Sequence, residues 1–439
     1  MGVENSLLGV AAGTEMTYEI DVTAVGVTIP TKIGESYKVW GPYGMVINNN
    51  PASKGFGQTL MLESYPQEIK DIYISHDKPG ALYAFDVNFQ PINSADGTPG
   101  FYGGLPIKGE TPLAIAGTYQ FDLRDIRFTA DGRLFVARAS GLDASSVYEL
   151  NPEDLDEPWK PLFKGGTLNP TTGVTYVGEQ EQCRMALGLA FEGKGEDLKM
   201  YVLGGQRSNG GNNTTDYNCS IYNLGTATEW TGAPSANYEP LDGVYTYSSV
   251  DVGIHEDRQG GLWFIQNRTG DTTPPIRHFN AAEGKVDYSS ATATNSGKMT
   301  ISTDGQYLAI PQGRGKIVLY ETNYVPMANG KIFLNPVSTI KVDETRITAL
   351  AFDYANNLYV ASASSETLSR YAIPSWKDNK CVTPAPEGFT VGTESGDPDA
   401  IKSLDGNTTN GAIYNIAGQR VSKAQNGIYV VDGKKVAVK

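Results

Sequence analysis

Short runs of alternating apolar and polar residues recur along the chain, and each run is followed by a polar turn and a second run. Five segments share this pattern, with Asp or Asn in the turn and with Leu or Met beside an aromatic residue in the second run. They read DIRFTADGRLFVA from Asp125, LAFEGKGEDLKMYVL from Leu189, VGIHEDRQGGLWFI from Val252, MTISTDGQYLAI from Met299 and LAFDYANNLYVA from Leu350. A period of two is typical of β-strands, and Asp, Asn and Gly favour tight hairpins. Each segment is therefore predicted to be a β-hairpin.

These hairpins are spaced like the units of a repeat protein. The anchor leucines after the turns are Leu134, Leu198, Leu262, Leu308 and Leu358, at separations of 64, 64, 46 and 50 residues. A four-stranded propeller blade takes about 40 to 50 residues, so the longer intervals are read as blades with insertions. The segments SSVYEL, CSIYNL, PIRHFN, KIVLYET and TLSRYAI, which follow the hairpins, are predicted to supply the third strands. The pattern indicates an all-β chain built as a β-propeller.

The units add up to six blades. A divergent unit precedes the five, with strands expected at 37–47, 59–63, 71–75 and 82–86. The last unit ends after three strands near Ile373, and an alternating run at Met16–Val27 is expected to complete it, because a ring closed by both ends of the chain leaves no exposed edge. A seventh blade within 91–120 or 165–182, or a pair of β-sandwiches, are the alternatives.

The chain divides into four segments. Residues 1–15 are expected to be a flexible N-terminus, and residues 16–375 the propeller. Residues 376–410 are rich in Pro, Gly, Asp and Thr with little periodicity, which is typical of a linker. Residues 411–439 contain three strand-like runs separated by turns and are predicted to form a small C-terminal β-meander, too short to be stable alone.

Composition narrows the classes of function. The 49 acidic and 35 basic residues give a net charge of −14, which disfavours binding to nucleic acid. No apolar run reaches the roughly 18 residues of a membrane span. Three cysteines, Cys183, Cys219 and Cys381, have no CxxC spacing and imply neither a zinc site nor a disulfide framework, although one pair could bridge. Met1-Gly2 suggests a start placed after a removed export signal, with a native cytoplasmic start as the alternative.

The C-terminal module carries the most specific resemblance. The matching residues are IYN from Ile413, AGQRV from Ala417, NGIYV from Asn426, GKKV from Gly433 and the final Lys439. They closely resemble the end of the C-terminal sorting modules of proteins that Gram-negative bacteria export by type IX secretion, although the full module is longer. The resemblance implies a bacterial protein that is secreted, periplasmic or located on the outer-membrane surface.

The propeller repeats resemble several families more loosely. The segment IHEDRQGGLWFIQNR from Ile254 to Arg268 is similar to the repeat of the periplasmic sensor propellers of hybrid two-component regulators. The blades also resemble those of six-bladed NHL-type and lactonase-type propellers, without catalytic residues that can be matched. These resemblances imply the fold and leave the activity open.

A recurring arginine is the main candidate for ligand binding. Arginines follow the second inner strand of four blades, namely Arg138, Arg207, Arg268 and Arg314. Loops at corresponding positions of a propeller gather around one mouth of the central channel, and Arg binds carboxylate or sulfate groups through two parallel hydrogen bonds. The arginines are expected to form an anion-binding site there. The alternative is a set of solvated loops whose arginines pair with local carboxylates.

The same loops carry amide and aromatic side chains. These include Asn212, Asn213, Tyr217 and Asn267, which could hold sugar hydroxyls and sugar faces. We therefore expect a cell-surface propeller that binds a glycan or another anionic or polar ligand at the channel mouth, in a setting of nutrient acquisition. No catalytic residue, metal site or cofactor is predicted, although calcium is possible.

Two other functions stay open. A propeller hydrolase or lyase, glycoside-active or lactonase-like and possibly calcium-dependent, would need converging carboxylates, for which the candidates are Glu63, Asp125, Glu192, Asp251 and Glu344. Inner-strand carboxylates in propellers also link neighbouring blades. A scaffold that binds other surface proteins is the third hypothesis. Of the histidines, His255 is expected in a hairpin turn and His278 packed inside a third strand.

Overall fold

The computed structural model describes the repeat region in separate segments. Apart from short gaps, the described residues are 42–63, 81–101, 122–139, 145–163, 186–207, 214–238, 251–267, 276–290, 298–326, 331–362 and 367–372, with isolated strands within 27–35, 166–177, 245–246 and 402–438. They are all-β, and their regular helical structure is a single 3-10 turn, η3 (Gly195–Asp197). No helix in the described part of the chain is long and apolar enough to cross a membrane.

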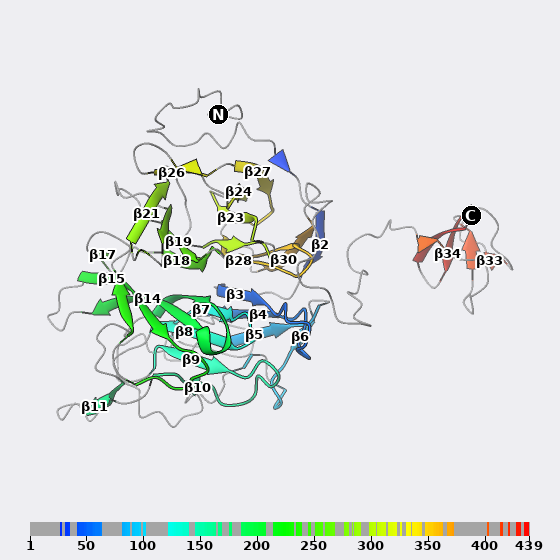
Figure 1. Cartoon of the computed structure of the whole chain (residues 1–439). Coiled ribbons are helices and arrows are strands. Elements are labelled where there is room, and N and C mark those ends of the chain that lie inside the picture. The colour runs from blue at the N-terminus through cyan, green and yellow to red at the C-terminus, as the bar shows by residue number, and fades with distance from the viewer. Residues whose placement is uncertain are drawn as a thin grey trace.

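The first three sheets of the repeat region follow one another along the chain and are mainly antiparallel (Figure 1). Sheet S1 contains β3 (Pro42–Ile47), β4 (Thr59–Glu63), β5 (Ala81–Phe85) and β6 (Pro91–Ile92). Sheet S2 contains β7 (Asp122–Phe128), β8 (Leu134–Ala139), β9 (Val147–Leu150) and β10 (Lys160–Pro161). Sheet S3 contains β13 (Ala186–Glu192), β14 (Lys199–Arg207), β15 (Thr214–Asn223), β16 (Ala236–Tyr238) and β17 (Tyr245–Thr246).

Three more sheets complete the repeat region among the described residues. Sheet S4 contains β18 (Asp251–Glu256), β19 (Gly261–Asn267), β20 (Ile276–Asn280), β21 (Lys285–Ser290), β26 (Lys331–Phe333) and β25 (Val325–Pro326). Sheet S5 contains β22 (Thr300–Ile301), β23 (Tyr307–Pro311), β24 (Lys316–Glu321), β27 (Pro336–Lys341) and β1 (Val27–Thr28). Sheet S6 contains β28 (Ile347–Phe352), β29 (Leu358–Ser362), β30 (Thr367–Ala372) and β2 (Thr31–Glu35).

The five predicted hairpins are confirmed, and four of them share one turn design. In these four, the side chain of the residue after the first strand accepts a hydrogen bond from the backbone N–H of the residue at, or just before, the start of the second strand. The four accepting residues are Thr129, Asp257, Ser302 and Asp353, with distances of 2.8 to 3.0 Å. The residue three positions later has a positive φ in each turn, at Gly132, Gly260, Gly305 and Asn356. The turn chemistry predicted from the sequence is therefore the chemistry observed.

Alternate side chains of each strand pack on opposite faces of its sheet. Leu134 and Val136 of β8 belong to a core cluster shared with S1, whereas Phe135 and Ala137 belong to a cluster shared with S3. Further clusters join S3 to S4, S4 to S5 and S5 to S6. A sixth cluster, which includes Met61 and Tyr359, joins S6 back to S1. Each sheet is therefore covered on both faces by its two neighbours, which is the arrangement of a propeller.

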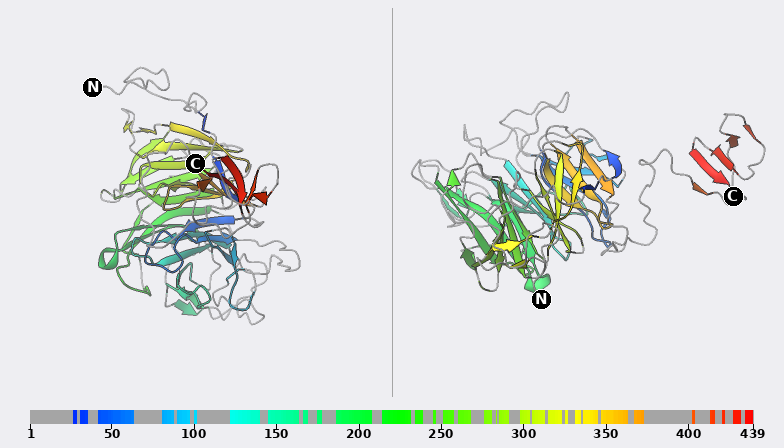
Figure 2. Two further views of the ribbon diagram at one scale, coloured as in Figure 1. Left: turned by 90° about the vertical axis from the view of Figure 1, so that its right-hand side faces the viewer. Right: turned by 90° about the horizontal axis from the view of Figure 1, so that it is seen from above.

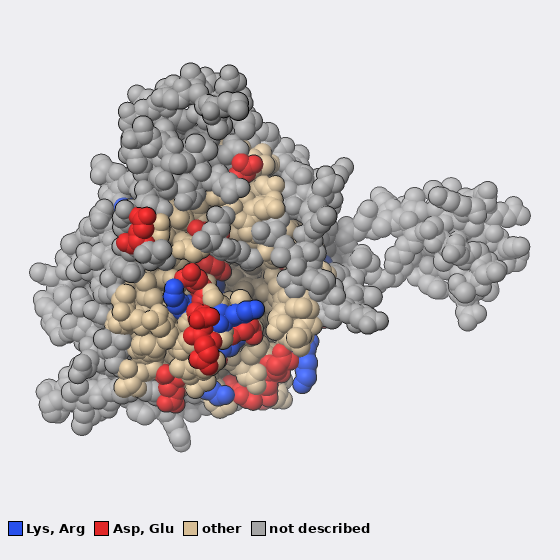
Figure 3. Space-filling view, viewed as in Figure 1, with Lys and Arg blue, Asp and Glu red and all other residues tan. Residues whose placement is uncertain are grey.

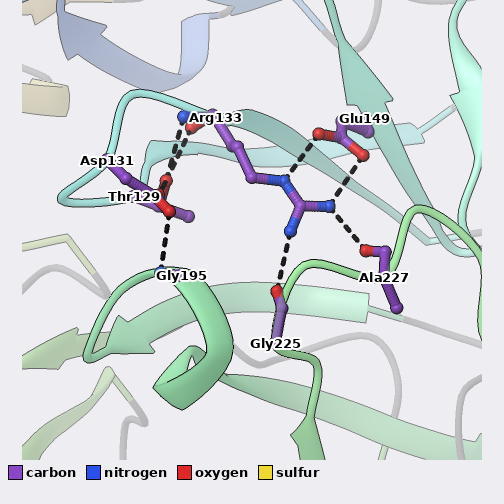
Figure 4. A network of polar contacts seen from close by, with 7 residues as sticks. All are labelled: Thr129, Asp131, Arg133, Glu149, Gly195, Gly225 and Ala227. Carbon is purple, nitrogen blue, oxygen red and sulfur yellow. Dashed lines mark hydrogen bonds and ion pairs between the residues drawn. The ribbon is translucent and has the colours of Figure 1, made fainter.

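Polar links between neighbouring sheets supplement this packing. Arg133, which opens the second strand of S2, makes a two-point ion pair with Glu149 at 2.7 and 2.9 Å (Figure 4). The same guanidinium donates to the carbonyl oxygens of Gly225 and Ala227 in S3, at 3.0 and 2.7 Å. Asp131 accepts a hydrogen bond from the backbone N–H of Gly195, again in S3. These contacts fix the hairpin turn of S2 against its neighbour.

The N-terminal segment contributes to two sheets. β1 pairs in parallel with β27 of S5, and β2 pairs antiparallel with β30, the third strand of S6. The sequence placed the closing strand at Met16–Val27, of which only Val27 lies within the described residues. The run that joins S6 is Thr31–Glu35, whose single large apolar side chain, Ile33, makes its alternation too short to stand out.

The remaining described strands form separate sheets. β11 (Gly166–Leu168) and β12 (Thr175–Val177) make a hairpin of their own. The C-terminal strands are β31 (Lys402–Ser403), β32 (Ile413–Asn415), β33 (Arg420–Val421), β34 (Gly427–Val431) and β35 (Lys434–Val438). They form one sheet, which lies apart from the others when seen from above (Figure 2). β31 comes from the segment expected to be a linker and pairs in parallel with β35.

Candidate functional site

A cavity of about 600 Å³ opens where the first strands of the six sheets end. The last residue of every first strand lines it: Ile47, Phe128, Glu192, Glu256, Ile301 and Phe352. Four of these side chains are apolar, and the two carboxylates come from the neighbouring sheets S3 and S4. We call this layer the first-strand ring. The cavity is therefore built by the repeat itself, and a volume of this size is typical of small-molecule sites.

The first strands reach this position because they lie close to one another. β3 contacts β7 and β28, β13 contacts β7 and β18, and β22 contacts β28. Glycines permit the closest approaches: a Cβ added at Gly44 would lie 3.1 Å from Cα of Asp125, and one at Gly188 would lie 2.7 Å from Cγ2 of Ile254. Any larger residue at Gly188 would push β13 away from β18.

A buried ion pair connects three of the sheets beside the cavity. Oδ2 of Asp125 lies 3.2 Å from Nε of Arg127 and accepts a hydrogen bond of 2.9 Å from the backbone N–H of Leu189 in S3. The Nη2 group of Arg127 donates to the carbonyl oxygen of Ile254 in S4, at 3.2 Å. The side chain of Arg127 is 17% exposed and that of Asp125 is 11% exposed. The guanidinium that lines the cavity is thus neutralised by a carboxylate held in place by the backbone.

The two ring carboxylates are more accessible than this pair. The side chain of Glu192 is 37% exposed, accepts a 2.6 Å hydrogen bond from the Tyr201 hydroxyl and lies 3.6 Å from Nζ of Lys199. The side chain of Glu256 is 26% exposed, with one carboxylate oxygen 3.5 Å from Nδ1 of His255. Both carboxylates are therefore partly exposed and keep capacity to accept further hydrogen bonds.

The cavity has no excess of positive charge. Among the described residues that line it, Arg127 is the one Lys or Arg, against the two carboxylates Glu192 and Glu256. Acidic and basic side chains are interleaved over the central part of the face drawn in Figure 3, and the described part of that face shows no purely positive patch. An anion would find the guanidinium of Arg127 already paired and two carboxylates close by.

Two of the arginines singled out in the sequence, Arg138 and Arg207, lie at the opposite ends of the strands. Arg138 pairs with Leu123 near the start of β7, so it is far along the hairpin from the first-strand ring. Its side chain is 1% exposed and donates to the Tyr148 hydroxyl at 3.1 Å, which places it in the interior of S2. Arg207 is the last residue of β14. Arg268 and Arg314 lie outside the described residues.

The amide candidates are placed in part. Asn267 ends β19 and pairs with Asp251, the first residue of β18, so it lies at the same end of the sheets as Arg138 and Arg207. Tyr217 pairs with Gly205 in S3. For these two residues and Arg207 only the backbone is described, and Asn212 and Asn213 lie outside the described residues. An anion-binding site at the second-strand ends therefore stays a prediction.

The other titratable candidates are occupied by structural contacts. Glu344 is buried and accepts a 2.7 Å hydrogen bond from the Tyr371 hydroxyl. His278 is buried with its Nε2 2.6 Å from Oδ2 of Asp257, as its position in a third strand suggested. Cys219 is a free thiol, and burial raises its pKa. In the described ranges no three His, Cys, Asp or Glu side chains form a group that could hold a metal ion.

Comparison with known proteins gives only distant similarity. No protein-family model and no curated protein matches the chain. The crystal structure of Raptor from Chaetomium thermophilum is similar with a TM-score of 0.42 and 12% identity, over 81% of this chain and 29% of the Raptor chain. A chain in the crystal structure of the Mitotic Checkpoint Complex is similar with a TM-score of 0.38 and 11% identity, over 82% of this chain and 96% of that one. This chain spans less than a third of the Raptor chain.

Proposed function

We propose that this chain is a six-bladed β-propeller that binds a glycan in the cavity at the first-strand ring. The observation that carries the proposal is that all six sheets contribute the last residue of their first strand to one cavity. Its lining mixes apolar side chains with carboxylate, hydroxyl and amide groups. A sugar needs this combination, because it presents hydrogen-bonding edges and apolar faces on the same ring. Six sheets that share six core clusters support the proposed number of six blades.

We further propose that the protein acts at or outside the bacterial cell envelope, in nutrient acquisition. This rests on the C-terminal residues from Ile413 to Lys439, which resemble sorting modules of exported proteins. A glycan-binding propeller in that location would capture polysaccharide fragments at the surface. Its partners would be the glycan and, secondarily, other surface proteins.

The proposal is tested by filling the cavity from its rim. Ala130 is exposed in the turn after β7 and lines the cavity, so Ala130→Trp adds a large side chain there without changing the core. Ala52→Trp is the matched control, because Ala52 is also exposed in the corresponding turn of S1 and does not line the cavity. We expect titration calorimetry with a panel of oligosaccharides to show that Ala130→Trp weakens binding at least tenfold and Ala52→Trp leaves it unchanged. Equal binding by both variants and the parent would place the ligand elsewhere, and release of shortened sugars would favour a hydrolase or lyase.

A further inference from the structure

We infer that the cavity at the first-strand ring recognises a non-anionic, hydroxyl-bearing sugar and discriminates against carboxylated or sulfated ones, with Glu192 and Glu256 as the groups that decide this. The inference rests on the proposed function and adds the charge class of its ligand. It also differs from the expectation, drawn from the arginine spacing, of an anionic glycan.

The first step is the state of Arg127. Its Nε is paired with Asp125, and its Nη2 donates to the carbonyl oxygen of Ile254. Asp125 is itself fixed by the backbone N–H groups of Ile126 and Leu189, at 3.0 and 2.9 Å. An incoming carboxylate or sulfate would have to compete with a carboxylate that is already buried and correctly oriented. Arg127 therefore acts as a structural cation and is a poor anion receptor.

The second step is the position of the two carboxylates. Glu192 and Glu256 are the last residues of β13 and β18, the first strands of adjacent and directly contacting sheets, so they occupy equivalent positions side by side on the ring. Ionised carboxylates only accept hydrogen bonds, and each has two oxygens with spare lone pairs. They can accept bonds from neighbouring sugar hydroxyls, which are stronger when the acceptor is charged. An anionic group at the same place would be repelled.

The third step is the remainder of the ring. Phe128 on one side of the carboxylates and Ile301 on the other are apolar, as are Ile47 and Phe352 of the two remaining sheets. The hydroxyl edge of a sugar would face Glu192 and Glu256, and Phe128, which is partly exposed, is the apolar ring position that could contact its C–H face. The side chains of Ile47, Ile301 and Phe352 are buried in the clusters between the sheets and shape the floor of the cavity. A volume of about 600 Å³ lies within the range of small-molecule sites.

The experiment compares matched sugars that differ in one group. The full chain is titrated calorimetrically with neutral gluco-, manno-, galacto- and xylo-oligosaccharides, and with counterparts carrying a uronic acid at the non-reducing end. We expect the best neutral sugar to bind at least tenfold more tightly than its uronate counterpart. Glu256→Gln should weaken binding of the neutral sugar several-fold, because the charged hydrogen-bond acceptor is lost while the size of the side chain is kept. It should also bring the affinities for the neutral sugar and the uronate closer together, because the repulsion of the uronate carboxylate is lost.

Controls separate this inference from the function on which it rests. Glu157→Gln removes an exposed carboxylate far from the ring, whose ion pair with Lys160 is 4.0 Å long, and should change neither affinity. If uronates bind more tightly than neutral sugars and Ala130→Trp blocks them, the inference is wrong and the proposed function stands. If no sugar of either class binds, both are wrong. If Glu256→Gln leaves the preference for neutral sugars intact, the two carboxylates do not set it.

Discussion

At the scale of single residues, the carboxylates differ in how many contacts they make within the fold, and this decides which of them can bind a ligand. Asp125 accepts hydrogen bonds from two backbone N–H groups and pairs with Arg127, so the pair of side chains links strands of three sheets. Glu192 and Glu256 lack such backbone donors among their described contacts and keep substantial exposure. The carboxylate is therefore structural at Asp125 and available to a ligand at Glu192 and Glu256.

Asp125→Asn tests this assignment. An amide has one acceptor oxygen, so one of the backbone N–H groups or Nε of Arg127 would face an NH₂ group instead. Because a largely buried cation also loses its partner, we expect the free energy of unfolding in guanidinium chloride to fall by about 3 kcal/mol. Asp154→Asn is the control, since Asp154 is exposed and accepts one local backbone hydrogen bond of 3.1 Å. A loss no larger than that of the control would mean that Arg127 is not held by Asp125 and is available to anions.

At the scale of strands and turns, the repeat was largely predictable. The hairpins from Asp125, Leu189, Val252, Met299 and Leu350 and their turns follow from period-two alternation and from residues that tolerate positive φ, both of which are local properties of the sequence. The short β2 strand was missed because its pairing with β30 depends on residues more than 300 positions away. Its place is set by ring closure rather than by its own pattern.

The candidate site was predictable only in part, for a related reason. Charged and amide residues in loops stand out in the sequence as candidates for binding, whereas the residues of the first-strand ring are mostly apolar and end a strand. Phe128, Glu192, Glu256 and Phe352 each precede the anchor leucine of their repeat by six residues, and this constant offset was a usable signal. The pattern predicts Arg138 after the second strand of its hairpin, like the other three candidate arginines, but its side chain is buried inside S2. The position of a residue in the repeat does not by itself tell which way its side chain points.

Two carboxylates that link the turns of neighbouring sheets have lowered pKa values, and they should make the stability of the fold depend on pH. Burial by itself would raise the pKa of Asp131, but hydrogen bonds from Thr129 and from the backbone N–H of Gly195 outweigh it and lower the pKa. Glu153 of S2 has a lowered pKa through hydrogen bonds from Ser53 and from the backbone N–H of Lys54 in S1. A carboxylate with a lowered pKa stabilises the fold above its pKa in the unfolded chain and loses this contribution as the pH falls through its pKa in the fold.

We therefore expect thermal stability to fall as the pH is lowered below about 4, near the ordinary pKa of Asp. The decrease should be smaller in Asp131→Asn than in the parent, because one of the titrating links is already absent. Melting temperatures measured between pH 7 and pH 3 check this, with Asp154→Asn as a control that should follow the parent. Parallel curves for Asp131→Asn and the parent would show that the link to Gly195 does not depend on the charge.

At the scale of the whole molecule, ring closure rests on the N-terminal segment. β2 covers the edge of S6 and β1 covers the edge of S5, so one short stretch of chain protects two sheets. The C-terminal sheet has no strand pairing with the sheets of the ring in the described part of the chain. The two ends of the chain should therefore contribute very differently to stability.

Truncations test this difference. Removing residues 1–28 takes away β1, and removing residues 1–35 takes away β1 and β2, which leaves β30 as an exposed edge. We expect the longer truncation to aggregate or to melt at a much lower temperature than the shorter one. Deleting residues 377–439 should leave the main unfolding transition nearly unchanged, because the described strands of the C-terminal sheet pair only with one another. A stable, soluble chain without residues 1–35 would contradict closure by β2.

The most direct test of the account is a crystal structure of the full chain soaked with the neutral oligosaccharide that binds best. The account predicts sugar density in the cavity at the first-strand ring, with hydroxyl groups within hydrogen-bond distance of the carboxylates of Glu192 and Glu256 and the Arg127–Asp125 pair intact. Density at the other end of the sheets, beside Arg207 and Asn267, with an empty first-strand cavity would contradict it.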